Sequence, residues 1–591
     1  MTNTLPDSLF QEFPAVSRNE WKTRATAELK DTPYEKIVWK TPDGFELEPW
    51  YSREEKRNFL LIPPGKSANS WINCRLINVT DPAAANSAAI KSISADVSAI
   101  EFCITNPSHC SPENLAILLS GIELQALPVY FSGNLPPADE LLAVLASIEG
   151  FSANEGGIIG ALSPVSQEMD AAYGKWLETL PAFRIFTVDT LPFHEQGSTP
   201  SQEIALALAG ASDMLNRFTE TGIAADRIVS AMEIILPVGT SHFTELAKPR
   251  ALRYLLGHLV KAYGADPGAL PRLFAKTSGR AISLLDPFTN VLRLTTEAVS
   301  AILGGYGTLQ IVPFDNGLSV ENDTAERITG NIHLILRSEA ALDHVIDPAA
   351  GSNYIETLTS KLAASAWDTF RKIEAEGGLN AALESGMINA MLAEAAAAEK
   401  KQLGNRKKTL IGVNRYPWPL TPEQQENIET LETIIGSGIK TSATASWELL
   451  RLKTLARAEK SGRCPSVLIW THGDPGISLR QAAFCEDFFK CGGFSIDGTT
   501  SLPVEEGSYI SSLQLNPDIV VLCIADKDPV PVAESICSTL QRLQPGIIVV
   551  MAGRPPQGHE KLLEAGLDSF VYTGVNVRDM LETYQHKTGV Q

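Results

Sequence analysis

Long apolar runs are absent from this sequence of 591 residues. Its most apolar segments, such as Ile547–Met551, have the length of a strand and fall far short of the roughly 20 residues that a membrane-spanning helix needs. The N-terminal segment MTNTLPDSLFQEFP has neither the basic-then-apolar pattern of a secretion signal nor the Arg-rich character of a transit peptide. We therefore expect no membrane partner, and the sequence predicts a cytoplasmic protein.

Positive charge and cysteine are both scarce. The chain has 49 Lys and Arg against 69 Asp and Glu, a formal net charge of -20 and a pI near 5.0. Such a chain repels phosphate backbones, so nucleic acid is not expected as a partner. The eight cysteines include no C-x-x-C pair, which indicates neither a disulfide framework nor a zinc module. Reduced and mostly buried thiols are the expected state.

The length of the chain predicts two or three domains, because single cores stop growing at roughly 250–300 residues. With 44% hydrophobic and 20% charged residues, the composition is typical of a globular protein with large cores. Residues 1–65 are polar with isolated aromatic side chains. This spacing predicts an extended N-terminal arm that buries its aromatic groups against another surface.

The rest of the sequence predicts an α/β protein with two sheets. In residues 66–345, eight short apolar runs alternate with helical patterns, which is typical of a (β/α)₈ TIM barrel. The strands are predicted near Trp71–Asn78, Ala99–Ile104, Ala126–Phe131, Gly157–Leu162, Phe183–Asp189, Ser230–Leu236, Arg272–Lys276 and Leu309–Phe314. Residues 346–462 read as a helical linker. In residues 463–591, five further βα units predict a flavodoxin-like doubly wound domain. Its strands are predicted at Ser466–Trp470, Gly493–Ile496, Asp518–Ile524, Gly546–Met551 and Ser569–Tyr572.

Six segments, in order along the chain, resemble signatures of the acyl-CoA mutases that depend on adenosylcobalamin. The segments are Trp39–Gly44 with Pro49 and Tyr51 (W-K-T-P-x-G), Glu245–Arg253 (E-x-A-K-x-R-A-x-R), Thr277–Gly279 (T-S-G), Asp286–Val291 (D-x-Y-N-N-V), Asp347–Glu356, and Ile411–Tyr416 (G-V-N-K-Y). The resemblance implies a carbon-skeleton rearrangement in which a CoA thioester threads the barrel. A base-off cobalamin then lies between the barrel and the C-terminal domain and supplies the radical.

The cobalt-binding signature of that family is degenerate in this chain. Active members hold cobalt through the His of a D-x-H-x-x-G loop, oriented by the Asp. The corresponding segment is Thr471–Ser478; anchoring on Asp474 places Gly476 at the ligand position, and anchoring on the downstream Gly493 places Ser478 there. Neither side chain ligates cobalt.

Other features of the C-terminal domain also depart from the family. His472 has no Asp two residues before it and is expected to be a solvated loop residue, and His559 and His586 also lack the pattern. Of the paired glycines after the fourth strand only Gly553 remains, followed by Arg554 in the space that the cofactor's nucleotide tail would need.

The barrel has lost its signature chemistry as well. Pro192 replaces the His of S-G-Y-H-x-x-E-x-G and has no N–H to donate, while His194 lies two positions further on. In the H-x-Q segment before T-S-G, Phe274 and Lys276 replace the His and the Gln. Trp71–Thr80, the counterpart of a run that carries a Tyr over the corrin, contains no Tyr.

The chain keeps the scaffold signatures of the family but lacks its catalytic and cofactor-binding residues. In this it resembles the small, non-catalytic subunit of the two-subunit members. The resemblance implies a heterodimer with a homologous catalytic large subunit, which binds the adenosylcobalamin. One alternative is an autonomous mutase with atypical cobalamin ligation, for example by His472. Another is a barrel hydrolase or aldolase joined to a receiver domain with Asp526 as phosphoacceptor, although Thr573 stands where a receiver needs Lys. Whether the barrel admits a CoA ester is left open by the sequence.

Overall fold

The computed structural model describes residues 16–52, 68–160, 167–316, 322–420, 443–502 and 513–590, with Gln424, Ile428 and Thr433 as isolated positions. The chain forms two compact units. The barrel unit consists of Met1–Thr277, Thr295–Val312 and Thr329–Leu392; the C-terminal unit consists of Ser278–Leu294, Pro313–Ile328 and Ala393–Gln591. The predicted domain boundaries after residues 65, 345 and 462 stay a prediction.

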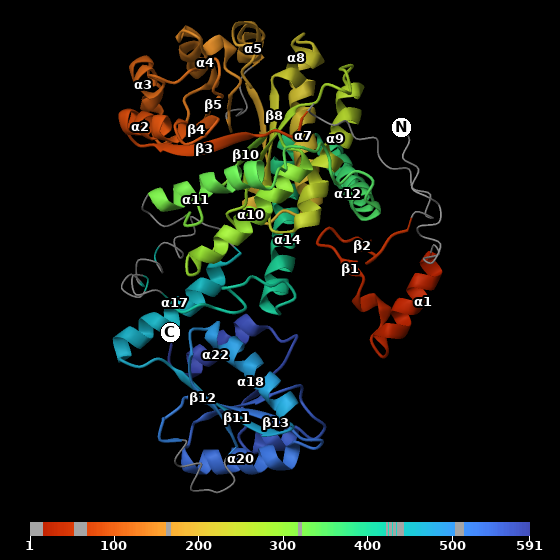
Figure 1. The fold of residues 1–591 in the computed structure, drawn as a ribbon, viewed down its shortest axis with the longest axis vertical. Coiled ribbons are helices and arrows are strands. Elements are labelled where there is room, and N and C mark those ends of the chain that lie inside the picture. The colour runs from red at the N-terminus through yellow and green to blue at the C-terminus, as the bar shows by residue number, and fades with distance from the viewer. Residues whose placement is uncertain are drawn as a thin grey trace. The chain divides into compact units, whose positions relative to one another are not determined.

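Eight parallel strands form the barrel, as predicted (Figure 1). They are β3 (Ile72–Val79), β4 (Ala99–Ile104), β5 (Val129–Gly133), β6 (Gly157–Ile158), β7 (Phe186–Asp189), β8 (Met232–Val238), β9 (Arg272–Thr277) and β10 (Thr308–Gln310). Their order is β6-β5-β4-β3-β10-β9-β8-β7. Arg184, just before β7, closes the ring through backbone hydrogen bonds: its N–H donates to the carbonyl of Gly156, and its carbonyl accepts from the N–H of Ile158. The predicted strand Gly157–Leu162 ends in part outside the described residues.

Helices follow the strands around the barrel. They are α2 (Pro82–Ile93), α3 (Pro112–Leu118), α4 (Ala138–Ser147), α5 (Gln167–Thr179), α6 (Leu191–Glu195), α7 (Pro200–Glu220), α8 (Ala225–Ser230), α9 (His242–Ala262), α10 (Pro287–Gly304), α11 (Asp323–Leu334), α12 (Asn353–Glu376), α13 (Leu379–Glu384) and α14 (Met387–Gly404). A local signal explains where two of them begin. Asp81 before α2 and Ser111 before α3 each accept a hydrogen bond from a backbone N–H of the first turn, and proline follows each cap.

The N-terminal arm forms a helix and a small hairpin. Helix α1 (Arg18–Leu29) buries none of its residues within this chain, while β1 (Trp39–Lys40) pairs with β2 (Glu46–Leu47). The hairpin docks on barrel helices, because Asp43 accepts a hydrogen bond of 2.8 Å from the backbone N–H of Ser201 at the start of α7. Lys361 of α12 donates to the backbone carbonyl of Glu46.

The C-terminal unit contains the five-stranded parallel sheet that the sequence predicts. Its order is β12-β11-β13-β14-β15, the flavodoxin-like 2-1-3-4-5 arrangement. The strands are β11 (Ser466–Gly473), β12 (Ser495–Ser501), β13 (Ile519–Ala525), β14 (Ile548–Ala552) and β15 (Ser569–Val571); the helices are α17 (Ala445–Ser461), α18 (Pro475–Lys490), α20 (Val530–Leu543), α21 (Glu560–Glu564) and α22 (Val577–Lys587).

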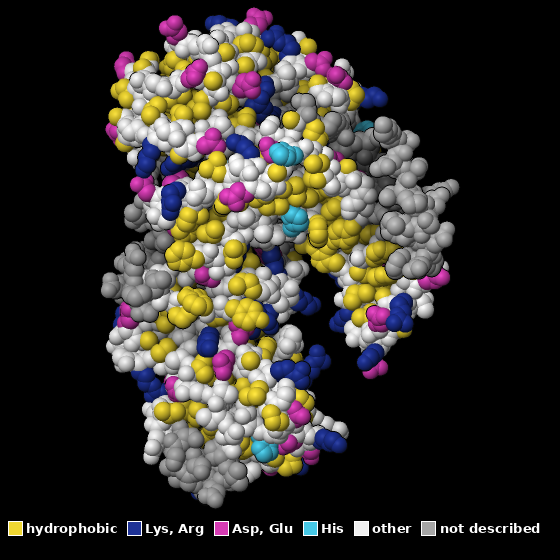
Figure 2. Space-filling model, viewed as in Figure 1, with side chains coloured by type: hydrophobic (Ala, Val, Ile, Leu, Met, Phe, Trp, Pro, Cys, Tyr) yellow, Lys and Arg dark blue, Asp and Glu magenta, His cyan; other side chains and the backbone are white. Residues whose placement is uncertain are grey.

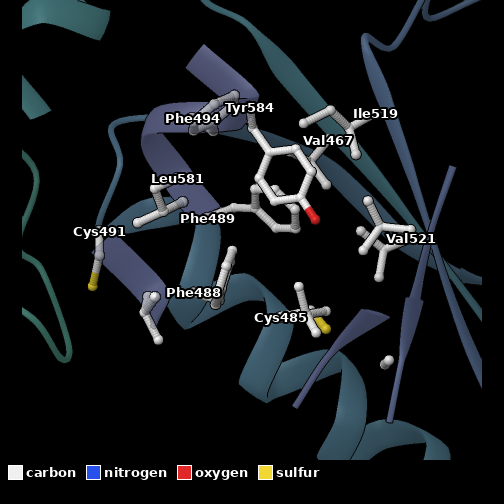
Figure 3. Close-up of a cluster of buried hydrophobic side chains, with 14 of the residues drawn as sticks. Val467, Cys485, Phe488, Phe489, Cys491, Phe494, Ile519, Val521, Leu581 and Tyr584 are labelled. Atoms are coloured by element: carbon white, nitrogen blue, oxygen red, sulfur yellow. The ribbon is translucent and has the colours of Figure 1, made fainter. Parts of the chain in front are cut away.

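Aromatic side chains fill one face of this sheet. Phe488 and Phe489 of α18 and Tyr584 of α22 gather over Val467 and Val521 of the central strands, and the Phe489 and Tyr584 ring centroids lie 5.4 Å apart (Figure 3). The cluster on the other face is buried to the same extent, with no member more than 9% exposed. It consists of Leu468, Trp470, Val520, Leu522, Ile524, Ala533, Ile536, Cys537, Leu540, Ile547, Val549, Met551, Leu562, Leu567 and Phe570.

The surface mixes both signs of charge. On the described part of the face in Figure 2, acidic and basic side chains are interspersed. Among the described residues, every helix is too short or too polar to cross a membrane. The eight cysteines are free thiols, and six of them are buried to 4% exposure or less: Cys74, Cys110, Cys485, Cys491, Cys523 and Cys537.

A buried histidine lies where the first barrel strand begins. The indole N–H of Trp71 donates to Nδ1 of His333 over 3.1 Å, and the guanidinium of Arg337 lies 5.1 Å from the Trp71 ring. His333 is 2% exposed. Its burial is the main cause that lowers its pKa to about 3, and the positive charge of Arg337 adds to the effect. The imidazole is therefore neutral in the folded protein over most of the acid range.

His333 is expected to make the barrel unit acid-labile. The unfolded chain takes up a proton below about pH 6.5 that the folded chain excludes until about pH 3, so stability falls as pH decreases by about 1.4 kcal/mol per pH unit in that window. His333→Gln keeps an acceptor for Trp71 and should reduce the loss between about pH 7.5 and about pH 5 by about 2 kcal/mol in urea unfolding. The exposed His344 supplies the control, because His344→Gln should leave the loss unchanged. Equal acid sensitivity of wild type and His333→Gln would contradict the assignment.

Candidate functional site

The kept signature segments of the barrel unit bind one another. Arg250 of α9 forms ion pairs with Asp347 and, at 2.6 Å, with Glu356 of α12. Arg253 donates to the backbone carbonyls of Gly304 and Gly305 over 2.8 and 2.7 Å. The E-x-A-K-x-R-A-x-R helix and the D-P segment about a hundred residues later thus stabilise the same packing.

Lys248 of the same helix lies in a buried ion cluster. Its ammonium, with 0% of the side chain exposed, lies 2.6 Å from Glu203 and 2.5 Å from Glu245, and it donates to the carbonyl of Pro237 over 2.7 Å. Burial opposes the charge of Glu203, but Lys248 and His194 outweigh it and lower the pKa of that carboxyl.

Signature segments of the C-terminal unit also contact one another. A Cβ added to Gly412, whose φ is +79°, would lie 2.1 Å from Oδ2 of Asp286, so the two signature segments meet at a point that only glycine allows. Asn290 bridges the carbonyls of Ser283 and Phe314. Glu448, 3% exposed, accepts hydrogen bonds from the hydroxyl of Ser283 and from adjacent backbone N–H groups.

Side chains close the barrel axis. Tyr130 of β5 and Phe274 of β9 come from strands that stand opposite each other in the ring, yet their ring centroids are only 5.2 Å apart. Both side chains are fully buried. They pack with the inward side chains Cys74, Ala99, Ile159 and Ile235. A thioester tail that threads the barrel would have to displace this layer.

Above this layer, toward the carboxyl ends of the strands, the interior is charged. Lys276 of β9 donates to both carboxylate oxygens of Glu101 on β4, over 2.9 and 2.7 Å, and the amide of Gln310 donates to Glu101 over 2.7 Å. Burial opposes the ammonium charge, but Glu101 and then Asp189 outweigh it and raise the pKa of Lys276. Lys276 is thus part of an internal ion pair.

Pro192 and His194 lie at the end of β7. Pro192 falls in the first turn of α6, a position that proline favours. Nδ1 of His194 lies 2.8 Å from Glu203, which links the ring to the Lys248 cluster. The structure therefore places His194 in a buried electrostatic network and not on the open surface.

The segment predicted as the cobalt-binding loop is a direct turn from strand to helix. Residues up to Gly473 belong to β11, and α18 begins at Pro475. Asp474 caps the helix by accepting from the N–H of Ile477. Gly476 lies in the first turn, and the buried Ser478 donates back to the carbonyl of Asp474. The prediction of a loop is wrong over this stretch, because an aspartate cap followed by proline starts a helix at once.

The expectation for His472 needs a correction. It lies at the end of β11 and not in a loop, and its Nε2 lies 3.2 Å from Oδ2 of Asp526, the residue after β13. The carboxylate nearest to its ring thus comes from the neighbouring strand β13 and not from a residue two positions before it. The side chain of His472 is 42% exposed, as expected of a solvated residue.

Arg554 does not fill the interior of the C-terminal domain. Gly553 follows β14 with φ of +121°, and Arg554 is exposed with its guanidinium 5.9 Å from the Tyr572 ring. The filling comes from the aromatic cluster of Figure 3, whose buried members are at most 9% exposed. The described residues of this domain therefore do not fit a cobalamin with a buried tail.

Sequence reasoning missed Glu101 and Tyr130, and it named Asp526 only as a possible phosphoacceptor. Glu101 interrupts the apolar strand AIEFCI, which is a signal for a buried, paired carboxylate. Tyr130 carried no signal, and nothing connected Asp526 with His472, because the partners Phe274 and His472 lie far away in the sequence. Among the described residues, no group of three or more His, Cys, Asp or Glu side chains is arranged so that it could hold a metal ion.

A closed (β/α)₈ barrel, a doubly wound 2-1-3-4-5 sheet and the interlocked signature segments define the architecture of the acyl-CoA mutases. The profile of methylmalonyl-CoA mutase matches residues 151–440. The methylmalonyl-CoA mutase small subunit of Porphyromonas gingivalis is 30% identical over 628 aligned residues, covering 99% of each chain. The chain belongs to the methylmalonyl-CoA mutase family.

The extent of the match differs between a small-subunit relative and a large-subunit relative. The methylmalonyl-CoA mutase small subunit of Streptomyces virginiae is 26% identical and again covers 99% of each chain. The methylmalonyl-CoA mutase large subunit of P. gingivalis is 31% identical over 257 residues, which are 43% of this chain and 35% of that protein. Both of these relatives that match 99% of the chain are small subunits.

Proposed function

We propose that this chain is the non-catalytic small subunit of a heterodimeric methylmalonyl-CoA mutase, an isomerase that interconverts methylmalonyl-CoA and succinyl-CoA. In this proposal the homologous large subunit binds adenosylcobalamin and performs the reaction, and the small subunit stabilises it. We further propose that Pro192, Phe274, Lys276, Asp474, Gly476, Ser478 and Gly553 occupy positions where catalytic or cofactor-binding groups have been lost, and that the complex is cytoplasmic.

The contact of Tyr130 with Phe274 carries this proposal. A pantetheine chain needs an open barrel axis, and two rings from opposite strands meet there at 5.2 Å. Opening the axis would move two fully buried aromatic side chains, each worth roughly 3–5 kcal/mol of packing. The ion pair of Lys276 with Glu101 occupies the next layer. Phe274 and Lys276 replace polar residues of the family signature and so create both obstructions.

The N-terminal arm supports the choice of partner. Helix α1 buries none of its residues within this chain, although Trp21 stacks on Trp50 with ring centroids 5.3 Å apart. A helix of this length is marginal alone and gains its stability from packing. We infer that a second subunit covers it, and the large-subunit relative makes a homologue the candidate.

Cofactor binding tests the proposal. The purified chain, mixed with adenosylcobalamin and passed through gel filtration, should elute without corrinoid absorbance and without isomerase activity. Co-expression with a homologue that has an intact D-x-H-x-x-G loop should give an equimolar complex with both properties. The large subunit alone is the control. Corrinoid that elutes with the isolated chain would contradict the proposal.

The pair of His472 and Asp526 favours one alternative, an autonomous mutase with atypical cobalamin ligation. An imidazole held by a carboxylate is the arrangement that metal-binding histidines use. If the isolated chain retains corrinoid, His472→Ala should abolish retention while His559→Ala should not, because His559 lies against the carbonyl of Pro556 on another loop. The absence of corrinoid from the isolated wild type would exclude this alternative.

A further inference from the structure

We propose that the upper layer of the barrel is a binding site for a small carboxylate that the chain fills with its own Glu101. The receptor groups are the ammonium of Lys276 and the amide of Gln310, on adjacent strands β9 and β10. Glu101 reaches them from β4, which is not a neighbour of either strand. This inference concerns the isolated chain and does not depend on the proposed function.

The geometry is that of a bound carboxylate ligand. Three hydrogen bonds of 2.7–2.9 Å converge on the two oxygens of Glu101, two from Lys276 and one from Gln310. Charge-assisted bonds of this length are the strong ones. Glu101 and Lys276 are 2% and 6% exposed, so neither charge is compensated by solvent. Each therefore depends on the other.

The layer has a closed floor and lies near the mouth of the barrel. Phe274, two residues before Lys276 on β9, forms the floor with Tyr130. Asp189, half-buried at the carboxyl end of β7, is the next anion that acts on Lys276. An external carboxylate that enters from the carboxyl ends of the strands must compete with Glu101, which is tethered and therefore present at high effective concentration.

Removal of the tethered carboxylate should convert the layer into an open receptor. Glu101→Ala leaves Lys276 buried without its counterion and a space the size of the lost carboxyl group. We expect the Tm to fall by on the order of 10 °C, because breaking a buried ion pair leaves an uncompensated charge. Formate or acetate should restore a large part of that loss in a saturable manner, whereas sodium chloride at equal ionic strength should not. The wild type should respond equally to formate and chloride.

A double variant controls for general salt effects and for the cavity. Glu101→Ala with Lys276→Met has the same space without the cation, and its Tm should show no formate dependence beyond that of chloride. If Glu101→Ala folds only in formate, removal of formate by dialysis should unfold it. The proposal is overturned if formate stabilises Glu101→Ala no more than chloride does, or if the double variant gains as much.

Discussion

Lys248→Met is expected to destabilise the barrel unit by about 3–5 kcal/mol near neutral pH, because it removes the buried ammonium that pairs with two buried carboxylates. Glu203 and Glu245 are 1% and 4% exposed, and both lie within 2.6 Å of the Lys248 ammonium. The loss should shrink as pH falls, since protonation of either carboxyl removes one of the uncompensated charges. Urea unfolding at several pH values measures both effects.

Two further variants show whether the cause is charge or packing. Adding Glu203→Gln to Lys248→Met should recover part of the lost stability by removing one buried anion. Arg24→Met breaks the exposed pair of Arg24 with Glu28 on α1 and should change stability little, as surface pairs do. If Lys248→Met and Arg24→Met had similar effects, the buried cluster would not carry the stability assigned to it.

Gly412→Ala is the second substitution with a large expected effect. The new Cβ would lie 2.1 Å from Oδ2 of Asp286, which already accepts a hydrogen bond of 2.6 Å from Thr289. Left-handed backbone adds to the steric cost, so we expect a loss of roughly 3 kcal/mol in the C-terminal unit. Faster amide exchange over residues 405–420, measured by mass spectrometry, should locate the change.

Gly462 is the matched control for that substitution. It has a similar positive φ of +71° at the end of α17, but an added Cβ would meet no atom within 4 Å. Gly462→Ala should therefore cost only about 1 kcal/mol, the conformational part alone. Equal losses at the two positions would show that backbone conformation, and not the approach of Asp286, explains the glycine of the G-V-N-R-Y segment.

The architecture was predictable because its signals are local. Strands buried on both faces, such as Ile519–Ala525, read as continuous apolar runs, and helical patterns separate them. Their rhythm predicted the barrel and the flavodoxin-like sheet. Only strand ends were displaced: β10 is Thr308–Gln310, shorter than the predicted Leu309–Phe314.

Residues of the candidate site could be predicted only where they fall within a signature motif of the family. The sequence pointed to Pro192, Phe274 and Lys276 because they interrupt family signatures. It gave no view of what Phe274 and Lys276 contact, since Tyr130 and Glu101 lie more than a hundred residues away. The sequence likewise did not show which carboxylate lies near His472, because that carboxylate belongs to Asp526 on another strand and not to a residue two positions before it.

Residue order by itself determined the succession of strands and helices, the caps that start α2, α3 and α18, and the family, because each depends on residues close together in the chain. Tertiary structure decided that the barrel axis is filled, that Lys276 forms an ion pair with Glu101 and that His472 lies beside Asp526. Those contacts join strands that are distant in sequence. Closure of the barrel brings the first two pairs together, and the pairing of β11 with β13 in the C-terminal sheet brings the third together.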